Sequence, residues 1–124
     1  MITGSVTPTR EAVISLELRG PDGRTARVQA TIDTGFDSFL MLPMRLVTEL
    51  HLEYDADASA VLADGTRVEL AYYWVELAWD GAAISAPALA ADCTPLVGMS
   101  LLYGCDLRIA VIDGGEVTIA PLAG

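Results

Sequence analysis

The triplet Asp33-Thr34-Gly35 is the part of this sequence whose residue types and setting are best suited to chemistry. It follows the apolar-alternating run 27–32 and precedes Phe36-Asp37-Ser38, so it is expected at the end of a strand. A glycine in such a turn lets the backbone come close to a bound partner. Acid–base work by paired carboxylates needs a second carboxylate, and the sequence holds no other Asp-Thr-Gly or Asp-Ser-Gly triplet. A second copy of the chain would therefore have to supply it.

Other kinds of catalytic centre find little support in the residues. His51 is the single histidine and is expected near the end of a helix, exposed to solvent. Neither Ser38 nor Ser100 has a base close in sequence, and a cysteine nucleophile would have His51 as its sole possible histidine partner. Without further histidines a metal centre has little support. We therefore expect neither a metal nor a cofactor.

The length and the net charge of the chain limit the classes of protein to which it can belong. The chain has 124 residues, of which 52% are hydrophobic and 19% charged, so one domain over residues 1–124 with a real core is expected. Its formal net charge is −10. Because that charge repels phosphate backbones and anionic lipid surfaces, neither a nucleic acid nor a membrane is expected as a partner.

The cysteines and the first residues bear on the compartment. Cys93 and Cys105 stand apart without metal-ligand spacing, which favours free thiols in a cytoplasmic protein, although a disulfide stays open if the chain is exported. Residues 1–5 lack the pattern of a secretion signal, and no apolar run is long enough to span a membrane.

The first half of the sequence predicts a hairpin, a buried strand and a helix. Residues 12–18 and 25–32 alternate as strands do, around a turn at Pro21-Asp22-Gly23. The run 39–42 reads as a short buried strand. Pro43 is typical of a helix start, and Leu46, Val47 and Leu50 would share the buried face of that helix.

The second half predicts further hairpins. Asp64-Gly65-Thr66 lies between β-like runs at 60–63 and 67–78, which is a strong hairpin signal, and a weaker strand is expected at 83–89. A short helix over 99–103 would end at Gly104. Two closing strands, 107–112 and 116–120, surround Asp113-Gly114-Gly115. The sequence thus predicts an all-β domain with one or two short helices.

Five features in this order resemble those of the retropepsin-like aspartic proteases, in particular the small members with an Asp-Thr-Gly triplet found in prokaryotes. They are the hairpin that leads to Asp33-Thr34-Gly35, the run Phe39-Leu40-Met41-Leu42-Pro43, the hairpin Leu62-Ala63-Asp64-Gly65-Thr66, the block Pro95-Leu96-Val97-Gly98-Met99-Ser100-Leu101-Leu102, and the closing strands to Ala120. The resemblance implies a closed-barrel-like acid protease fold that assembles as a symmetric homodimer.

The resemblance also implies residue roles. Asp33 of each chain would form the catalytic dyad, Thr34 would bond across the dimer, and Gly35 would allow the tight loop with its N–H near the carboxylate. Asp37 would bind substrate backbone. Asp64, Gly65 and Thr66 would form the tip of a flap that closes over substrate. Asp33 and Thr34 could instead be ordinary turn residues, and Asp37 could cap its loop.

Two further expectations concern the surroundings of this loop. Leu96-Val97-Gly98, which faintly repeats the strand-then-glycine pattern of residues 32–35, would pack beneath the active loop as scaffold. Phe36 stands where alanine is commoner in the family, which affects pocket size. The aromatic residues of the middle strand could line a groove, but core or interface packing is the favoured interpretation; they are Tyr72, Tyr73, Trp74 and Trp79.

The function that follows is an aspartic endopeptidase acting on peptides or unfolded protein segments, as a homodimer. The alternatives are a non-catalytic dimerisation or peptide-binding module on the same fold, or a monomeric domain that docks on a larger partner. In the dimer, residues 117–120 could be an edge strand interleaved with the other chain, although Pro121 would limit its pairing.

Overall fold

The structure is a computed structural model that describes residues 1–61 and 64–122. The strands and helices of this described part, in chain order, are β1 (Ile2–Val6), β2 (Ala12–Arg19), β3 (Thr25–Ile32), β4 (Leu40–Pro43), α1 (Met44–Glu49), β5 (Glu53–Val61), β6 (Arg67–Trp79), β7 (Ala82–Ala91), β8 (Leu96–Val97), α2 (Met99–Leu102), β9 (Cys105–Ile109) and β10 (Glu116–Pro121). The expectation of an all-β domain with one or two short helices is confirmed, and the described part of the chain has two.

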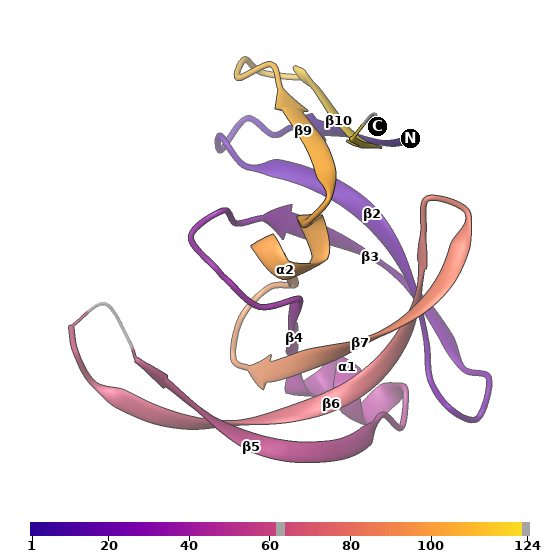
Figure 1. Cartoon of the computed structure of the whole chain (residues 1–124), viewed down its shortest axis with the longest axis vertical. Helices are drawn as coiled ribbons and strands as arrows, with labels where there is room; N and C mark the ends of the chain where they lie inside the picture. Colours follow the sequence, from indigo (N-terminus) through magenta and orange to yellow (C-terminus); the bar gives the residue numbers. More distant parts are fainter. Residues whose placement is uncertain (62–63, 123–124) are drawn as a thin grey trace.

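Six of the described strands close into a barrel, in the order β2, β3, β8, β4, β7 and β6. The ring is closed where β6 returns to β2, through the antiparallel pairs Leu18↔Leu77 and Arg19↔Glu76. Beyond the ring, β5 extends the sheet on one side as the outer arm of a long hairpin with β6, and β1, β10 and β9 extend it on the other (Figure 1). This is the closed-barrel architecture that the family resemblance implies.

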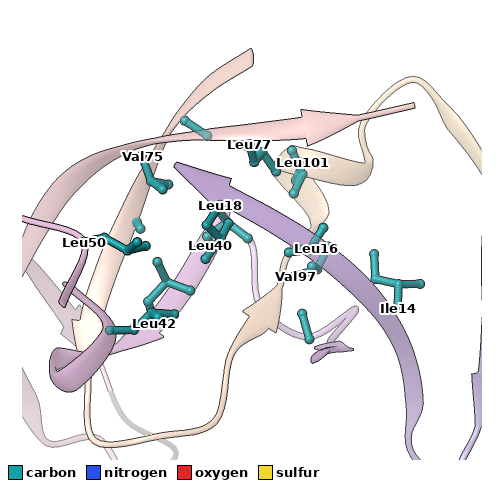
Figure 2. Packing of buried hydrophobic residues seen from close by; sticks show 14 of the residues in the cluster. Ile14, Leu16, Leu18, Leu40, Leu42, Leu50, Val75, Leu77, Val97 and Leu101 are labelled. Carbon is teal, nitrogen blue, oxygen red and sulfur yellow. The ribbon is translucent and has the colours of Figure 1, made fainter. Parts of the chain in front are cut away.

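Much of the core lies inside this ring because alternate residues of its strands point inward, and buried residues of β1, β10 and the two helices belong to the same cluster. Ile14, Leu16 and Leu18 of β2 are all buried, and the polar residues between them are exposed. Figure 2 shows these side chains gathered with those of β4, β6 and β8 in one cluster. Leu40, Leu42 and Val97 belong to this cluster, which fixes the two short strands that flank the Asp33 loop.

The predicted helix follows directly on β4. Pro43 is the last residue of β4 and the N-cap of α1, so the helix begins one residue later than the proline. Leu46, Val47 and Leu50 are buried as predicted. The weaker strand and the helix before Gly104 are also present, as β7 and α2.

Three strand expectations need correction. β1 is not predicted from the sequence. β5 begins at Glu53, earlier than the expected run 60–63, and the sequence does not indicate this start because the first residues of β5 alternate acids with alanine and carry no apolar signal. The expected strand 107–112 begins and ends earlier, at Cys105–Ile109. The hairpin residues Leu62 and Ala63 lie outside the described residues.

The expectation of an edge strand at residues 117–120 is wrong. β10 lies inside the sheet, paired with β1 on one side and with β9 on the other. Pro121 does not prevent this, because the pairing with β1 ends at Ile2↔Ile119 and no ladder bond needs an N–H at residue 121.

Candidate functional site

Asp33 lies at the carboxyl end of β3, on a loop held by its own backbone. The N–H of Asp33 donates to the carbonyl of Val97 at 2.9 Å, and the N–H of Phe36 closes the turn on the Asp33 carbonyl at 3.2 Å. The N–H of Gly35 donates to Asp33 Oδ1 at 2.9 Å, the contact that the sequence predicts for this glycine. One carboxylate oxygen is therefore oriented by the loop, while the side chain remains partly exposed.

Gly98 forms the floor of this loop. β8 pairs in parallel with the end of β3, through Thr31↔Leu96 and Ile32↔Val97, which brings the next residue under the loop. A Cβ on Gly98 would lie 2.2 Å from the Ser38 carbonyl oxygen and 2.8 Å from that of Phe36. Only glycine fits there, so the block 96–98 is the scaffold that the sequence predicts.

The short helix α2 fastens the far side of the loop. The N–H of Met99 donates to the Phe36 carbonyl at 2.7 Å, and the N–H of Ser100 donates to the Ser38 carbonyl at 3.1 Å. The Ser100 hydroxyl donates to the carbonyl of Asp37 at 2.5 Å. These three bonds fix residues 36–38 and leave the Asp37 side chain exposed beside them.

A groove of about 510 Å³ lies between this loop and the β5–β6 hairpin. Its lining is mostly apolar, with polar groups at intervals, and comprises Gly35, Phe36, Asp37, Ser38, Met41, Ser59, Val61, Leu70, Tyr72 and Leu89. In Figure 1 the β5–β6 hairpin and the loop between β3 and β4 extend on the same side of the barrel, and these two segments form opposite walls of the groove. The arrangement suits an extended chain with apolar side chains.

The wall that faces the loop contains residues that the sequence interpretation did not assign to a site. Tyr72 lines the groove, and its hydroxyl lies 3.3 Å from the Ser38 hydroxyl, so groove lining, the less favoured of the two expectations, holds for this aromatic residue in place of core packing. Leu70 and Tyr72 are two apart on β6, and their shared strand face was the available signal. Leu89 could not be found from sequence, because it reaches the groove through the parallel pairing of β7 with β4.

The other aromatic residues follow the packing expectation in part. Tyr73 and Trp79 pack against the core, and the Tyr73 ring meets that of Tyr54 edge to face, with centroids 5.8 Å apart. Trp74 is 44% exposed and lies outside the groove lining.

The turn of the β5–β6 hairpin has the predicted chemistry. Gly65 has φ +86°, a conformation that favours glycine, and the N–H of Thr66 donates to Asp64 Oδ1 at 2.8 Å. The Thr66 hydroxyl and this backbone bond hold the pKa of Asp64 below its usual value. These three residues are exposed, and the hairpin lines the groove with its arms rather than with residues 64–66.

The histidine and the two cysteines, which could support another chemistry, do not line the groove. His51 is exposed at the end of α1, with Nδ1 2.9 Å from Asp22 Oδ2. Cys93 and Cys105 are free thiols, and burial together with the neighbouring Asp92 raises the pKa of Cys93. Within residues 1–61 and 64–122, no group of three or more His, Cys, Asp or Glu side chains is placed to hold a metal ion. No helix in that part of the chain is long and apolar enough to cross a membrane.

A six-stranded barrel with an Asp-Thr-Gly loop braced by a glycine and a short helix is a retropepsin-like fold. Among solved structures, the chain resembles the EIAV protease complexed with the inhibitor HBY-793, with a TM-score of 0.61 over 77% of this chain and 88% of that one. The two sequences are 18% identical, so the likeness establishes the fold. No family model and no curated protein matches the sequence. Membership of the small prokaryotic group therefore stays a prediction.

Proposed function

We propose that this protein is an aspartic endopeptidase whose catalytic dyad consists of Asp33 from each chain of a homodimer. The observation that supports it most is the Asp33 carboxylate, oriented by Gly35 on a loop of the retropepsin-like barrel whose next residues, 35–38, line a groove of about 510 Å³. The chain contains one such loop, so a complete dyad needs a second copy.

In this dimer the two carboxylates divide the work between them. Two like charges a few ångströms apart cannot both ionise cheaply, so they share one proton at moderate acidity. The ionised carboxylate takes a proton from a water molecule, whose oxygen attacks the scissile carbonyl carbon, while the protonated carboxyl polarises the carbonyl oxygen. The proton then passes to the leaving amine as the C–N bond breaks. The pair titrates as a unit, so activity should fall on both sides of an acidic optimum.

The remaining residues of the loop have supporting roles in this proposal. Thr34 is exposed, and in the described part of the chain its hydroxyl has no hydrogen bond, which leaves it available to the opposite loop. Asp37 faces the groove and could accept N–H bonds from substrate backbone. Asp64, Gly65 and Thr66 would close over bound substrate as the tip of the flap.

The test is the Asp33→Asn substitution, assayed on a peptide library between mildly acidic and neutral pH. It removes the shared proton from both sites of the dimer, so we expect kcat/KM to fall at least about a thousandfold. Asp80→Asn, an equally small change in the turn between β6 and β7, is the matched control and should retain activity. Sedimentation of each variant establishes that the dimer persists.

The alternative module gives a different result in the same experiment. If the verified wild-type dimer cleaves no peptide in the library, catalysis is excluded and a peptide-binding or dimerisation role is favoured. Equal cleavage by wild type and Asp33→Asn would assign any activity to another site or to a contaminant.

A further inference from the structure

A hollow lies on the outer face of the barrel, where the pairing between β2 and β6 stops. The last pair of these two strands is Arg19↔Glu76. Beyond it the chain leaves β2 and turns at residues 20–23, whereas β6 remains paired with β7. The space left between the turn and β6 is a hollow of about 150 Å³, called the outer hollow below. Its lining comprises Arg19, Gly20, Pro21, Glu53, Trp74, Val75, Glu76 and Ser85.

Both walls of the outer hollow are held in place by the fold. The turn that forms one wall packs against the end of α1, since a Cβ on Gly20 would lie 1.9 Å from the Leu50 carbonyl oxygen. In the same turn, Asp22 lies 2.9 Å from Nδ1 of His51. The other wall belongs to β6, which pairs with β7 over nine residues. The outer hollow is therefore preformed, and a preformed site lowers the entropic cost of binding.

An exposed indole ring with a glutamate on either side lines the outer hollow. Trp74 is 44% exposed, although it is one of the largest apolar side chains of the protein. Glu53 lies directly opposite Trp74 on β5, and Glu76 is two residues further along β6, on the same face. Residues at such positions have their Cβ atoms about 5 to 7 Å apart, so both carboxylates can reach the edge of the ring.

The two glutamates of the outer hollow have no cationic partner within residues 1–61 and 64–122. Neither Glu53 nor Glu76 forms an ion pair there. Arg19 is directly opposite Glu76 but extends toward the β2–β3 turn, where its Nη2 lies 3.9 Å from the place that a Cβ on Gly23 would occupy. The hollow thus presents two negative charges beside the face of an aromatic ring, and both features attract a cation.

We propose that the outer hollow binds a lysine or arginine side chain of another protein, with the cationic end over the Trp74 ring and between Glu53 and Glu76. The ring and the two carboxylates then act on the same positive charge. The long alkyl stem of such a side chain can lie against Pro21, which is part of the lining. The formal net charge of −10 attracts basic segments to this surface.

The outer hollow is separate from the groove beside Asp33. Among the described residues the two share no lining side chain. The β2–β3 turn and the Asp33 loop lie at opposite ends of β3, roughly 25 Å apart for a strand of eight residues (Figure 1). A basic segment held in the outer hollow would leave the groove free. The inference therefore goes beyond the proposed function and does not depend on it.

The test measures the fluorescence anisotropy of a short, labelled, arginine-rich peptide titrated with the protein. Trp74→Leu removes the aromatic ring without changing the net charge, and we expect the dissociation constant to rise about threefold to tenfold. Glu53→Gln and Glu76→Gln should each weaken binding to a similar extent. All three side chains are exposed, so the variants should fold as the wild type does, which circular dichroism checks.

Two matched controls distinguish a site from general attraction to an acidic protein. Asp113→Asn removes one negative charge from the exposed turn after β9, and Tyr103→Leu removes an aromatic ring that is 90% exposed. Both positions lie outside the lining of the outer hollow, so each variant should change the dissociation constant by less than about twofold. A labelled glutamate-rich peptide should not bind the wild type.

The outcomes separate this inference from the proposed function. Full affinity in Trp74→Leu, equal weakening by Asp113→Asn and Glu76→Gln, or a wild type that does not bind the arginine-rich peptide would overturn the site. Asp33→Asn should bind this peptide as the wild type does, and a loss of affinity there would move the binding to the groove. A protein that binds through Trp74 but cleaves no peptide would keep the site and remove the protease.

Discussion

At the scale of single residues, Gly98 decides whether the Asp33 loop can have its observed shape. The backbones of Phe36 and Ser38 cross the Gly98 Cα so closely that any side chain would meet two carbonyl oxygens. The same residue caps α2, and its own N–H donates to the Phe39 carbonyl at 3.0 Å. One glycine therefore ties the loop, the helix and β8 into a single rigid unit.

We predict that Gly98→Ala destabilises the protein by about 3 kcal/mol or more, because the added methyl group must displace backbone rather than a flexible side chain. Gly81→Ala is the control, since space is open around Gly81 and its φ of +83° costs about 1 kcal/mol. Urea unfolding measures both. Equal losses in the two variants would contradict the role given to Gly98.

At the scale of elements, the β2–β3 turn is fastened to the end of α1 by one carboxylate. Asp22 accepts the backbone N–H and the Nε–H of Arg24, each at 3.1 Å, and Oδ2 lies 2.9 Å from Nδ1 of His51. The backbone bond from Arg24, with His51 and the Arg24 side chain, holds the pKa of Asp22 below its usual 3.8. The turn and the helix are 29 residues apart in sequence at this contact.

We predict that Asp22→Asn lowers the free energy of unfolding near neutral pH and has no such effect in strong acid. The folded-state pKa of Asp22 lies below its unfolded value, so the stabilisation is complete above the unfolded pKa and is lost as pH falls through the folded one. Urea midpoints at about pH 7 and about pH 2.5 measure this difference. Asp113→Asn, in the exposed turn after β9, should leave both midpoints unchanged; an effect of Asp22→Asn that persists in acid would contradict the electrostatic origin.

At the scale of the whole molecule, the barrel is closed by a short pairing between β2 and β6. β2 and β6 share the two pairs Leu18↔Leu77 and Arg19↔Glu76, whereas β6 and β7 pair over nine residues. Leu18 and Leu77 are buried at this junction and belong to the same cluster as β4 and β8 (Figure 2). The closure therefore depends on side-chain packing more than on backbone bonds.

We predict that Leu18→Ala costs about 2–5 kcal/mol, because a cavity would form where the ring closes. Met44→Ala, at the exposed start of α1, should change stability by less than about 0.5 kcal/mol. Thermal and urea unfolding of both variants measure the difference. A loss in Leu18→Ala no greater than in Met44→Ala would show that the closure contributes little.

The sequence was sufficient to predict those elements whose structure depends on residues that are neighbours along the chain. Alternation located β2, β3 and β6, and turn residues such as Asp64-Gly65 located the hairpins, because side-chain direction and turn conformation are local properties. The Asp33-Thr34-Gly35 loop was located in the same way, and its Gly35 contact is present as predicted. Only the end of β5 was located, by the run that starts at residue 60, since the alternation of acids and alanine before it gives no apolar signal.

Only the tertiary structure decided which distant segments meet. The pairing of β3 with β8 brings Gly98 under the Asp33 loop, and that of β4 with β7 turns Leu89 into the groove. β10 lies between β1 and β9, so among the described strands β9, and not the last strand of the chain, stands at that end of the sheet. Such pairings depend on the packing of the whole barrel, since the hydrogen bonds of a strand are the same with any partner and no short stretch of sequence specifies the choice.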